Sequence, residues 1–329
     1  MKTKKISHTN VIIDKVSFTI PILKSQRPKV LDRINNPTFY SDCSKKVFKN
    51  NKGRYKNDYQ FTIANDCIIS VNMYPINTQQ NFLRLEYNPA KMDSKTKVKL
   101  RRFLLDLLAL KTVKFIYYEA NVTRIDLAID IKGLDSQLYI YKPRFKESAL
   151  ERSEADENVI ASQIIGSSNS DMRSILYNTT LPRAGQIVLT QYKGEYRLES
   201  RIRLRKVRLC NLNKKLLKEL TEHHFYSHQF LSDPKFDAGF IEAAKKSGLC
   251  YAIHHLSDNN RRRYRRYLEF YRVHPIDWKK LDFDQAHYRA FTSLVHPSFK
   301  DKELVASNKS LLRGGVSSYK RAIMVSKAA

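Results

Sequence analysis

The stretch that decides the fold reads Thr123-Arg124-Ile125-Asp126-Leu127-Ala128-Ile129-Asp130-Ile131. Its apolar and polar residues alternate, and side chains on a strand point to opposite faces in turn, so the pattern predicts a half-buried strand. The polar face carries two carboxylates, Asp126 and Asp130, with the small Ala128 between them. Like charges this close repel unless a cation or a proton lies between them. The pattern therefore fits either a cation site or an ordinary solvated face.

Further strand-like runs lie on both sides of this stretch, with one amphipathic helix among them. The helix starts at Asp93 or Ser94 and ends near Leu110, whereas the polar residues 24–57 are typical of a loop. Residues 148–160 are compatible with a helix, and 187–191 with 196–204 predict a hairpin. The remaining predicted strands are 11–22, 59–63, 67–73, 82–87, 113–118 and 175–178. This order predicts an α+β fold, with helices packed on an antiparallel sheet.

The pattern changes from strands to helices after about residue 208. Leucines recur at helical spacing from Leu212, and helices are predicted at 240–246, 261–273 and 283–295. We therefore expect a sheet-containing domain at 1–208, a mostly helical basic region at 209–305 and a flexible basic tail at 306–329.

The charge of the chain is far from balanced. Sixty Lys and Arg residues against 32 Asp and Glu give a net charge of +28 over 329 residues, spread along the whole length. Such a chain repels itself unless a polyanion screens it, which favours a nucleic acid as partner. The 19 tyrosines and 16 phenylalanines interleaved with the basic residues suit stacking on unpaired bases.

Other classes of protein fit the sequence less well. No apolar run is long enough to cross a membrane, and the first residues lack the apolar core of a signal peptide, so we expect a cytoplasmic protein without membrane contact. The four cysteines lie far apart with no Cys-x-x-Cys spacing, and no His-x-His occurs, which argues against a zinc site.

Four short motifs follow one another between residues 80 and 205. They are Arg124-x-Asp126-x-Ala128-x-Asp130, Gly166-Ser167-Ser168-Asn169-Ser170, Tyr177-Asn178 and Arg197-x-Glu199. In this order and spacing the chain resembles the trans-acting replication initiators of rolling-circle plasmids and filamentous phages. It departs from their pattern at Thr179, where the family usually has lysine, and at 174–176, where arginine or aromatic residues are usual.

The resemblance implies an enzyme that nicks one DNA strand at an origin. In that family a tyrosine becomes joined to the 5′ phosphate with the help of a divalent metal, and a helicase commonly follows. Tyr177 is then the expected nucleophile, with Tyr192 and Tyr196 in reserve. Carboxylate oxygens select Mg²⁺ or Mn²⁺. The residues carried over as metal ligands are Asp126, Asp130 and Glu199, and Arg124 and Arg197 are expected to hold neighbouring phosphates.

Each of these residues also has a plain structural interpretation. Tyr177 fits equally well as a packed strand aromatic. Glu199 could pair with Arg197, Arg201 or Arg203, which lie two or four positions away on the same predicted strand.

A second basic run lies at residues 261–272. On a helix Tyr264, Tyr267, Leu268 and Tyr271 fall on one face, which suits burial. The arginines then point outward, either as a solvated face or toward DNA phosphates. The predicted DNA-binding residues here are Arg261, Arg262, Arg263, Arg265 and Arg266.

The sequence thus predicts a replication initiator that binds double-stranded origin DNA and single-stranded DNA and nicks one strand. A helicase is an expected partner, and a homodimer is allowed. Two alternatives stay open: a non-catalytic sequence-specific regulator on the same scaffold, and a single-strand nucleic-acid-binding protein.

Overall fold

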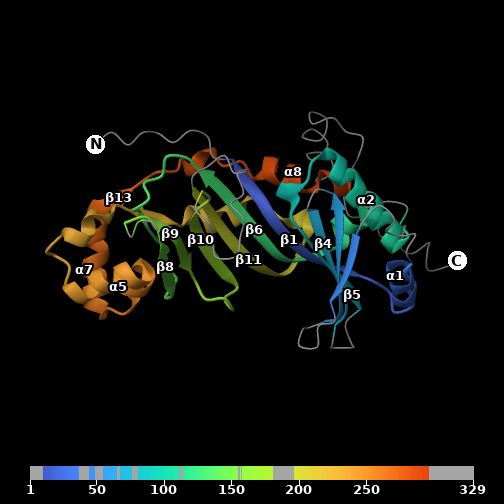
Figure 1. Cartoon of the computed structure of the whole chain (residues 1–329), viewed down its shortest axis with the longest axis horizontal. Helices are drawn as coiled ribbons and strands as arrows, with labels where there is room; N and C mark the ends of the chain where they lie inside the picture. Colours follow the sequence, from blue (N-terminus) through green and yellow to red (C-terminus); the bar gives the residue numbers. More distant parts are fainter. Residues whose placement is uncertain are drawn as a thin grey trace.

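The computed structural model describes residues 10–36, 44–48, 55–64, 67–75, 81–110, 114–154, 156, 158–180 and 196–295. These residues form an elongated α+β molecule, in which a large sheet runs through the middle and helices lie at both ends (Figure 1). The predicted fold class is therefore confirmed.

The main sheet has ten strands in the order β2-β3-β4-β5-β1-β6-β11-β10-β9-β8, and neighbouring strands pair antiparallel. Strand β6, which carries the alternating residues 123–131, lies near its centre between β1 and β11. The strands are β1 (Val11–Pro21), β2 (Ser44–Phe48), β3 (Tyr55–Ala64), β4 (Cys67–Pro75), β5 (Phe82–Tyr87), β6 (Asn121–Ile131), β8 (Ser148–Arg152), β9 (Ile160–Ile165), β10 (Met172–Asn178) and β11 (Tyr196–Arg208).

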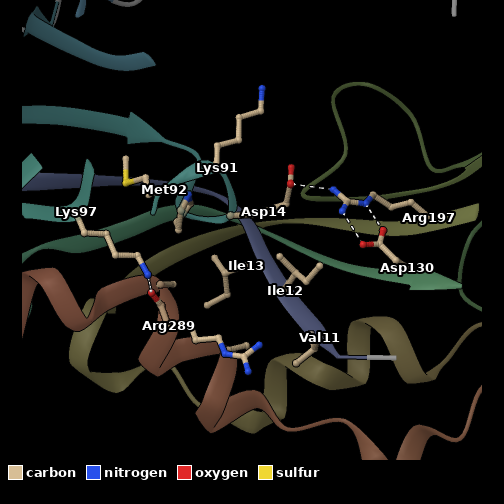
Figure 2. Close-up of a pocket in the computed structure, with 14 residues that line it drawn as sticks. Val11, Ile12, Ile13, Asp14, Lys91, Met92, Lys97, Asp130, Arg197 and Arg289 are labelled. Carbon is tan, nitrogen blue, oxygen red and sulfur yellow. Dashed lines mark hydrogen bonds and ion pairs between the residues drawn. The ribbon is translucent and has the colours of Figure 1, made fainter. Parts of the chain in front are cut away.

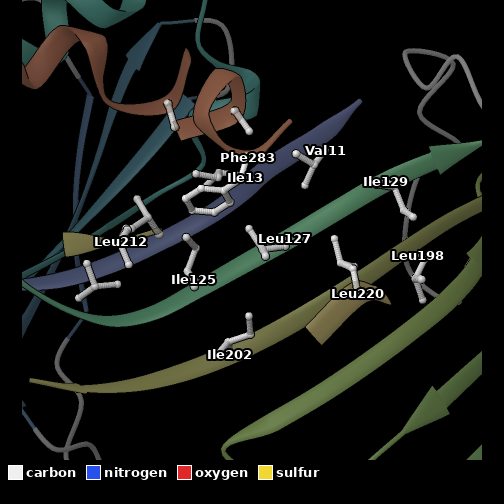
Figure 3. Close-up of a cluster of buried hydrophobic side chains, with 14 of the residues drawn as sticks. Val11, Ile13, Ile125, Leu127, Ile129, Leu198, Ile202, Leu212, Leu220 and Phe283 are labelled. Atoms are coloured by element: carbon white, nitrogen blue, oxygen red, sulfur yellow. The ribbon is translucent and has the colours of Figure 1, made fainter. Parts of the chain in front are cut away.

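One face of this sheet forms the core of the molecule. The alternate residues Ile125, Leu127, Ile129 and Ile131 of β6 are fully buried, as the alternation predicts. Figure 3 shows Ile125, Leu127 and Ile129 beside Ile13, Leu198 and Ile202 from neighbouring strands, covered by Phe283, Leu212 and Leu220.

Helices cover the sheet at the end formed by the N-terminal strands. Helix α2 (Ser94–Leu108) starts where predicted, because the Asp93 side chain accepts a hydrogen bond from the Thr96 amide at 2.7 Å. Its Phe103 packs on Phe61 of β3 with ring centres 4.9 Å apart. Helix α8 (Phe283–Val295) contacts both β1 and α2. No helix in the described ranges is long and apolar enough to cross a membrane.

Apart from α8, most of the chain after residue 208 forms a second cluster at the other end. It contains α4 (Lys218–Thr221), α5 (Ala238–Ser247), α6 (Leu249–His254), α7 (Asp258–Leu268) and a small sheet of β7 (Tyr139–Tyr141), β12 (His224–Tyr226) and β13 (Arg272–Val273). Because β7 comes from the N-terminal part and α5 contacts β8, this cluster is built from both sides of residue 208. The division into two domains and a tail stays a prediction.

Three sequence predictions of secondary structure were wrong. The polar stretch 24–57 is more than a loop: it holds α1 (Gln26–Asn35), which buries only Val30 and Ile34, as well as β2 and the start of β3. Residues 113–118 were expected as a strand because they are rich in aromatic and β-branched residues. Instead α3 (Lys114–Glu119) is a short helix that buries Ile116, so tertiary packing overrides strand propensity.

The third error is the helix expected at 148–160, where β8 forms an edge strand paired with β9. The leucine pattern after Leu212 also gives two short turns of helix, Lys214–Leu217 and α4, and no long helix. Strand β11 pairs with β10 and β6, and residues 187–191, its predicted hairpin partner, lie outside the described residues.

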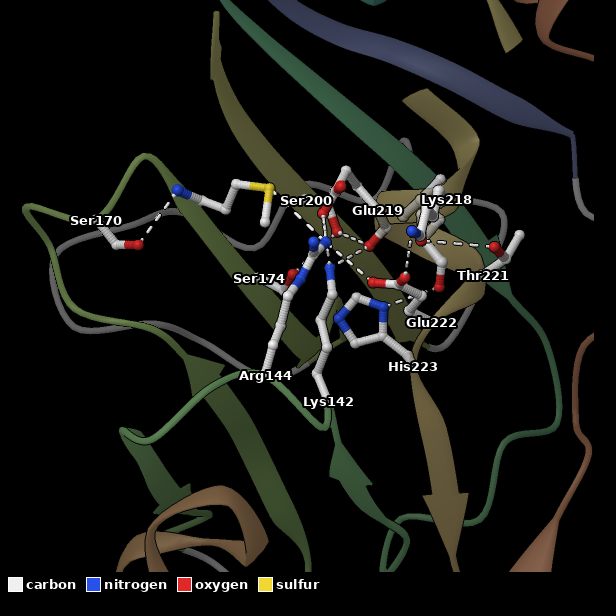
Figure 4. Close-up of polar contacts among 12 residues, drawn as sticks. Lys142, Arg144, Ser170, Ser174, Ser200, Lys218, Glu219, Thr221, Glu222 and His223 are labelled. Carbon is white, nitrogen blue, oxygen red and sulfur yellow. Dashed lines mark hydrogen bonds and ion pairs between the residues drawn. The ribbon is translucent and has the colours of Figure 1, made fainter. Parts of the chain in front are cut away.

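A buried ionic cluster joins the two parts of the chain (Figure 4). The side chain of Lys142, after β7, is 1% exposed, and its Nζ donates to the Glu219 carbonyl at 2.7 Å and to the Glu219 carboxylate at 3.0 Å. Arg144 pairs with Glu219 and with Glu222. Next to them His223 is buried, and its Nδ1 lies 2.8 Å from the Leu220 carbonyl, so Nδ1 carries the proton.

His223 makes stability depend on pH. Burial, reinforced by the charge of Lys142, lowers its pKa from 6.5 to about 3. Below pH 6.5 the unfolded chain therefore binds a proton that the folded chain does not. The free energy of unfolding then falls by up to about 1.4 kcal/mol for each unit by which the pH falls.

We expect His223→Asn, which keeps a donor for Leu220, to reduce the change in the free energy of unfolding between pH 7 and 5, as measured by urea unfolding. The exposed His274→Asn is the control, and equal pH dependence in both variants would contradict this role.

Candidate functional site

Three strands of the sheet bring the predicted nicking residues to one face. Arg197 of β11 lies opposite Asp130 of β6 on one side and opposite Tyr177 of β10 on the other. Two residues along β11, Glu199 lies opposite Ala128. Residues in register on neighbouring strands share a face, so all these side chains lie on the face opposite the core. We call it the polar face, and it carries Arg124, Asp126, Asp130, Arg173, Tyr177, Arg197, Glu199 and Arg201.

Arg197 sits at the centre of this face and is only 3% exposed. Its Nε and Nη2 donate to the two carboxylate oxygens of Asp130 at 2.6 and 3.0 Å, and its Nη1 donates to Asp14 at 3.1 Å (Figure 2). Burial alone would lower the pKa of Arg197, but the hydrogen bond and charge of Asp130 raise it above the ordinary arginine value. The guanidinium is therefore permanently charged and fixed in place.

A second ion pair lies on β6 itself. Asp126 is 1% exposed, and Arg124 Nε donates to one of its oxygens at 2.8 Å while Arg124 Nη2 donates to the other. The two residues are two positions apart on one strand, so they share a face without any turn of the chain.

These two pairs bear on the predicted metal site. Asp126 and Asp130 each give both oxygens to an arginine, and the described part of the chain holds no group of three or more metal-ligating side chains. As the side chains stand, the three predicted ligands do not fit a divalent cation. The reason is that Arg124 and Arg197 already neutralise the two carboxylates that were predicted to bind the metal. A site for Mg²⁺ or Mn²⁺ stays a prediction.

Glu199 differs from the two aspartates. It is half-buried and forms no hydrogen bond or ion pair with any described residue, so the expected pairing with Arg197, Arg201 or Arg203 is not formed. Burial and then the charges of Asp126 and Asp14 raise its pKa to about 7, against the opposing charges of Arg197 and Arg124. Its carboxyl group therefore gains and loses a proton near neutral pH.

The structure separates the candidate nucleophiles. Tyr177 is 9% exposed and lies on the polar face in register with Arg197. Tyr196 precedes Arg197, so its side chain lies on the core face, where its hydroxyl donates to the Ile160 carbonyl at 3.3 Å. Tyr192 lies outside the described residues.

Asp14, which completes the pairing of Arg197, is not among the residues that the sequence predicted for the site. A signal was present: in Ile13-Asp14-Lys15-Val16 two residues separate inward-facing apolar ones, which breaks the strand alternation. The pairing of β1 with β6 shifts register there, as expected for a bulge that turns Asp14 toward the polar face.

A cavity of about 440 Å³ opens beside this bulge. Asp130 and Arg197 lie at one end of it and Lys97 and Arg289 at the other, with Asp14 and Lys91 between them, as Figure 2 shows. The candidate site thus has a recess next to it with both signs of charge.

The arginines of α7 lie as predicted, with one exception. Tyr264 and Leu268 are buried, whereas Arg262, Arg263, Arg265 and Arg266 are exposed. None of these four pairs with a carboxylate among the residues that the structure describes.

Arg261 has a structural role. Its guanidinium donates to the carbonyls of Ile253, His254 and Leu256 at 3.3, 2.9 and 3.0 Å, and so caps the C-terminal end of α6. Its remaining nitrogen pairs with Asp258. Its side chain is therefore already satisfied within the protein.

Comparisons with known proteins find similarity among solved structures but not among family models or curated proteins. No protein-family model matches the chain, and no curated protein matches it. Among solved structures, the chain is similar to a rolling circle replication initiator protein from Geobacillus stearothermophilus, at 15% identity over 67% of this chain and 88% of that one, with a TM-score of 0.39.

The raised pKa of Glu199 gives a prediction about stability. The folded state favours the neutral carboxyl, so folding loses stability as pH rises from about 4.5 through 7. We expect Glu199→Gln to be more stable than the parent at pH 8, by on the order of 1–3 kcal/mol, and nearly equal at pH 5. Thermal unfolding at both pH values measures this. The exposed Glu242→Gln should change neither value, and a Glu199 variant that behaves like it would contradict the pKa assignment.

Proposed function

We propose that this protein is a DNA-binding replication initiator that cleaves one DNA strand through Tyr177. The observation that carries the proposal is the register of β6, β11 and β10, which aligns Asp130, Arg197 and Tyr177 on one face with Glu199 diagonal to them. A tyrosine, a carboxyl group that titrates near pH 7 and several arginines are the groups that phosphoryl transfer to a hydroxyl requires.

The proposed reaction exchanges one phosphodiester for another. The Tyr177 hydroxyl oxygen attacks the phosphorus, the bond to the 3′ oxygen breaks, and the protein is left joined to the 5′ phosphate. A free tyrosine has a pKa of about 10, so its proton needs an acceptor, and Glu199 is the group on the polar face that can take it. The departing 3′ oxygen then takes up a proton and becomes a hydroxyl group that can prime synthesis.

Arginines on the same face support binding of the phosphates. Arg201 lies opposite Arg173 on one side and Asp126 on the other, and its buried Nε has no hydrogen-bond partner among the described residues. A buried donor without a partner is costly, and a phosphate oxygen would satisfy it. Arg124 and Arg173 add charge beside it, and their charges lower the pKa of Arg201 in addition to burial.

The proposed reaction does not depend on the predicted metal, and an experiment can show whether a metal is needed. Mg²⁺ or Mn²⁺ would supply charge to neutralise the phosphate, but it could use Asp126 or Asp130 only after displacing Arg124 or Arg197. Cleavage of supercoiled cognate DNA with Mg²⁺, with Mn²⁺ and with a chelator decides whether a metal is needed.

A non-catalytic regulator is the second candidate, and one observation favours it. The aspartates that would bind a metal are occupied by arginines, which is what a purely structural ionic network looks like. The third candidate, a single-strand nucleic-acid-binding protein, draws on charge and aromatic content alone. The expected helicase and homodimer stay predictions.

The covalent step predicts a specific loss in one variant. Tyr177→Phe removes only the hydroxyl, so it should fold and bind DNA like the parent but form no nick and no protein–DNA adduct that survives denaturation. Supercoiled plasmid carrying the cognate sequence, resolved on denaturing gels, measures both products. Tyr196→Phe is the matched control and should keep both. Adduct formation by Tyr177→Phe together with its loss in Tyr192→Phe would move the nucleophile, and no adduct from the parent would favour the regulator.

The exposed arginines of α7 predict a change in salt dependence. Each phosphate neutralised contributes about −0.9 to the slope of log K against log salt. Replacing Arg262, Arg263, Arg265 and Arg266 with alanine should make the slope less steep and weaken binding to any duplex, as measured by fluorescence anisotropy. The control replaces four exposed lysines at the other end of the molecule: Lys24, Lys29, Lys95 and Lys99. Equal slopes for the two variants would remove α7 from the interface.

A further inference from the structure

One aromatic side chain on the basic end of the molecule is strongly exposed. Phe270 lies in the 3-10 turn Glu269–Tyr271 that directly follows α7, and it is 79% exposed, more than any other large apolar side chain in the described ranges. A single exposed apolar residue needs no special function. Its surroundings decide whether it has one.

The backbone that carries Phe270 is held on both sides. Glu269 accepts a hydrogen bond from the Tyr226 hydroxyl at 3.3 Å and pairs with Arg272 at 3.0 Å. Tyr271 donates its hydroxyl hydrogen to Asp233 at 2.7 Å. The exposed ring is therefore presented by a fixed turn, and a ligand that contacts it does not have to order the chain first.

Cations lie beside the ring. Arg262, Arg266 and Phe270 follow one another at intervals of four residues, which places them along one stripe of α7 and the turn after it. Lys235 Nζ lies 5.7 Å from the ring centres of both Phe270 and Tyr267. The surface is thus an aromatic platform with positive charge along two sides.

We propose that Phe270, supported by Tyr267 and Lys235, stacks on an unpaired DNA base while Arg262 and Arg266 hold the neighbouring phosphates. This rests on the proposed DNA binding and adds that the target contains an unpaired or opened base. A fully paired duplex offers no base face to a ring, whereas single strands, loops and opened base steps do.

The composition of the surface favours nucleic acid over other partners. Insertion into a membrane interface needs a broad apolar face, but Tyr264 and Leu268 of the same helix are buried and only Phe270 projects. The centre of a protein interface is depleted in charged residues, whereas arginines without a carboxylate partner in the described chain line this stripe.

The test uses the full-length protein and two DNA probes. One is a stem–loop with 2-aminopurine at an unpaired loop position, and the other is a fully paired duplex with the same stem. Stacking on an aromatic ring is worth about 1–3 kcal/mol per base, so Phe270→Ala should weaken stem–loop binding at least about fivefold and restore the 2-aminopurine fluorescence that the parent quenches. Duplex binding should change less than about twofold.

Three variants make the result specific. Phe270→Tyr keeps the ring and should behave like the parent, whereas Lys235→Ala should lose part of the stem–loop affinity. Val98→Ala truncates another exposed apolar side chain, on α2, and should have no effect. Equal melting temperatures show that folding is unchanged.

The outcomes separate this inference from the proposed function. Unchanged stem–loop affinity and fluorescence in Phe270→Ala would overturn the stacking site while duplex binding by the parent still supports an initiator. A parent that binds neither probe would overturn both. A Phe270→Ala defect on vesicles of phosphatidylcholine and phosphatidylserine, with none on the stem–loop, would overturn the stacking site in favour of a membrane contact.

Discussion

The pairing of buried Arg197 with Asp130 and Asp14 is the interaction on which the rest of the polar face depends. It joins three strands that lie side by side, because Arg197 comes from β11, Asp130 from β6 and Asp14 from the bulge of β1. Removing one partner of a buried ion pair typically costs about 3–5 kcal/mol, since the other charge is left without compensation. Without Arg197, two carboxylates would face each other across the strands that carry the candidate site.

This pairing also sets the properties of its neighbours. Arg197 lies between Tyr177 and Asp130 and lowers the pKa of Glu199, while Asp14 and Asp126 raise it. The result is a carboxyl group that titrates near neutral pH next to a tyrosine and to Arg201, whose Nε has no partner in the described chain. These groups destabilise the folded state, and buried polar groups with shifted pKa values are more often found at functional sites than elsewhere.

The sequence predicted the elements with strong periodicity and missed those that depend on distant contacts. The alternation in β6 and the helical spacing in α2 and α8 each reflect a single buried face, and their limits agree with prediction to within about two residues. By contrast, α3 has strand-like residues and is a helix, while β8 has helix-compatible residues and pairs at the sheet edge. Those outcomes depend on neighbours from other parts of the chain, which local propensity does not contain.

Most residues of the candidate site were predictable from the sequence, but Asp14 and the pairing of the charged side chains were not. Alternation alone placed Asp126 and Asp130 on one face, yet only the strand order shows that Arg197 lies opposite Asp130 and that Tyr196 faces the core. The central claim is that DNA lies across the polar face of β6, β10 and β11. Photocrosslinking a cognate oligonucleotide that carries 5-iododeoxyuridine, followed by mass spectrometry of the peptides, tests it most directly. The account predicts crosslinks to residues 172–178 and 196–203, and crosslinks confined to the helices with none on these strands would contradict it.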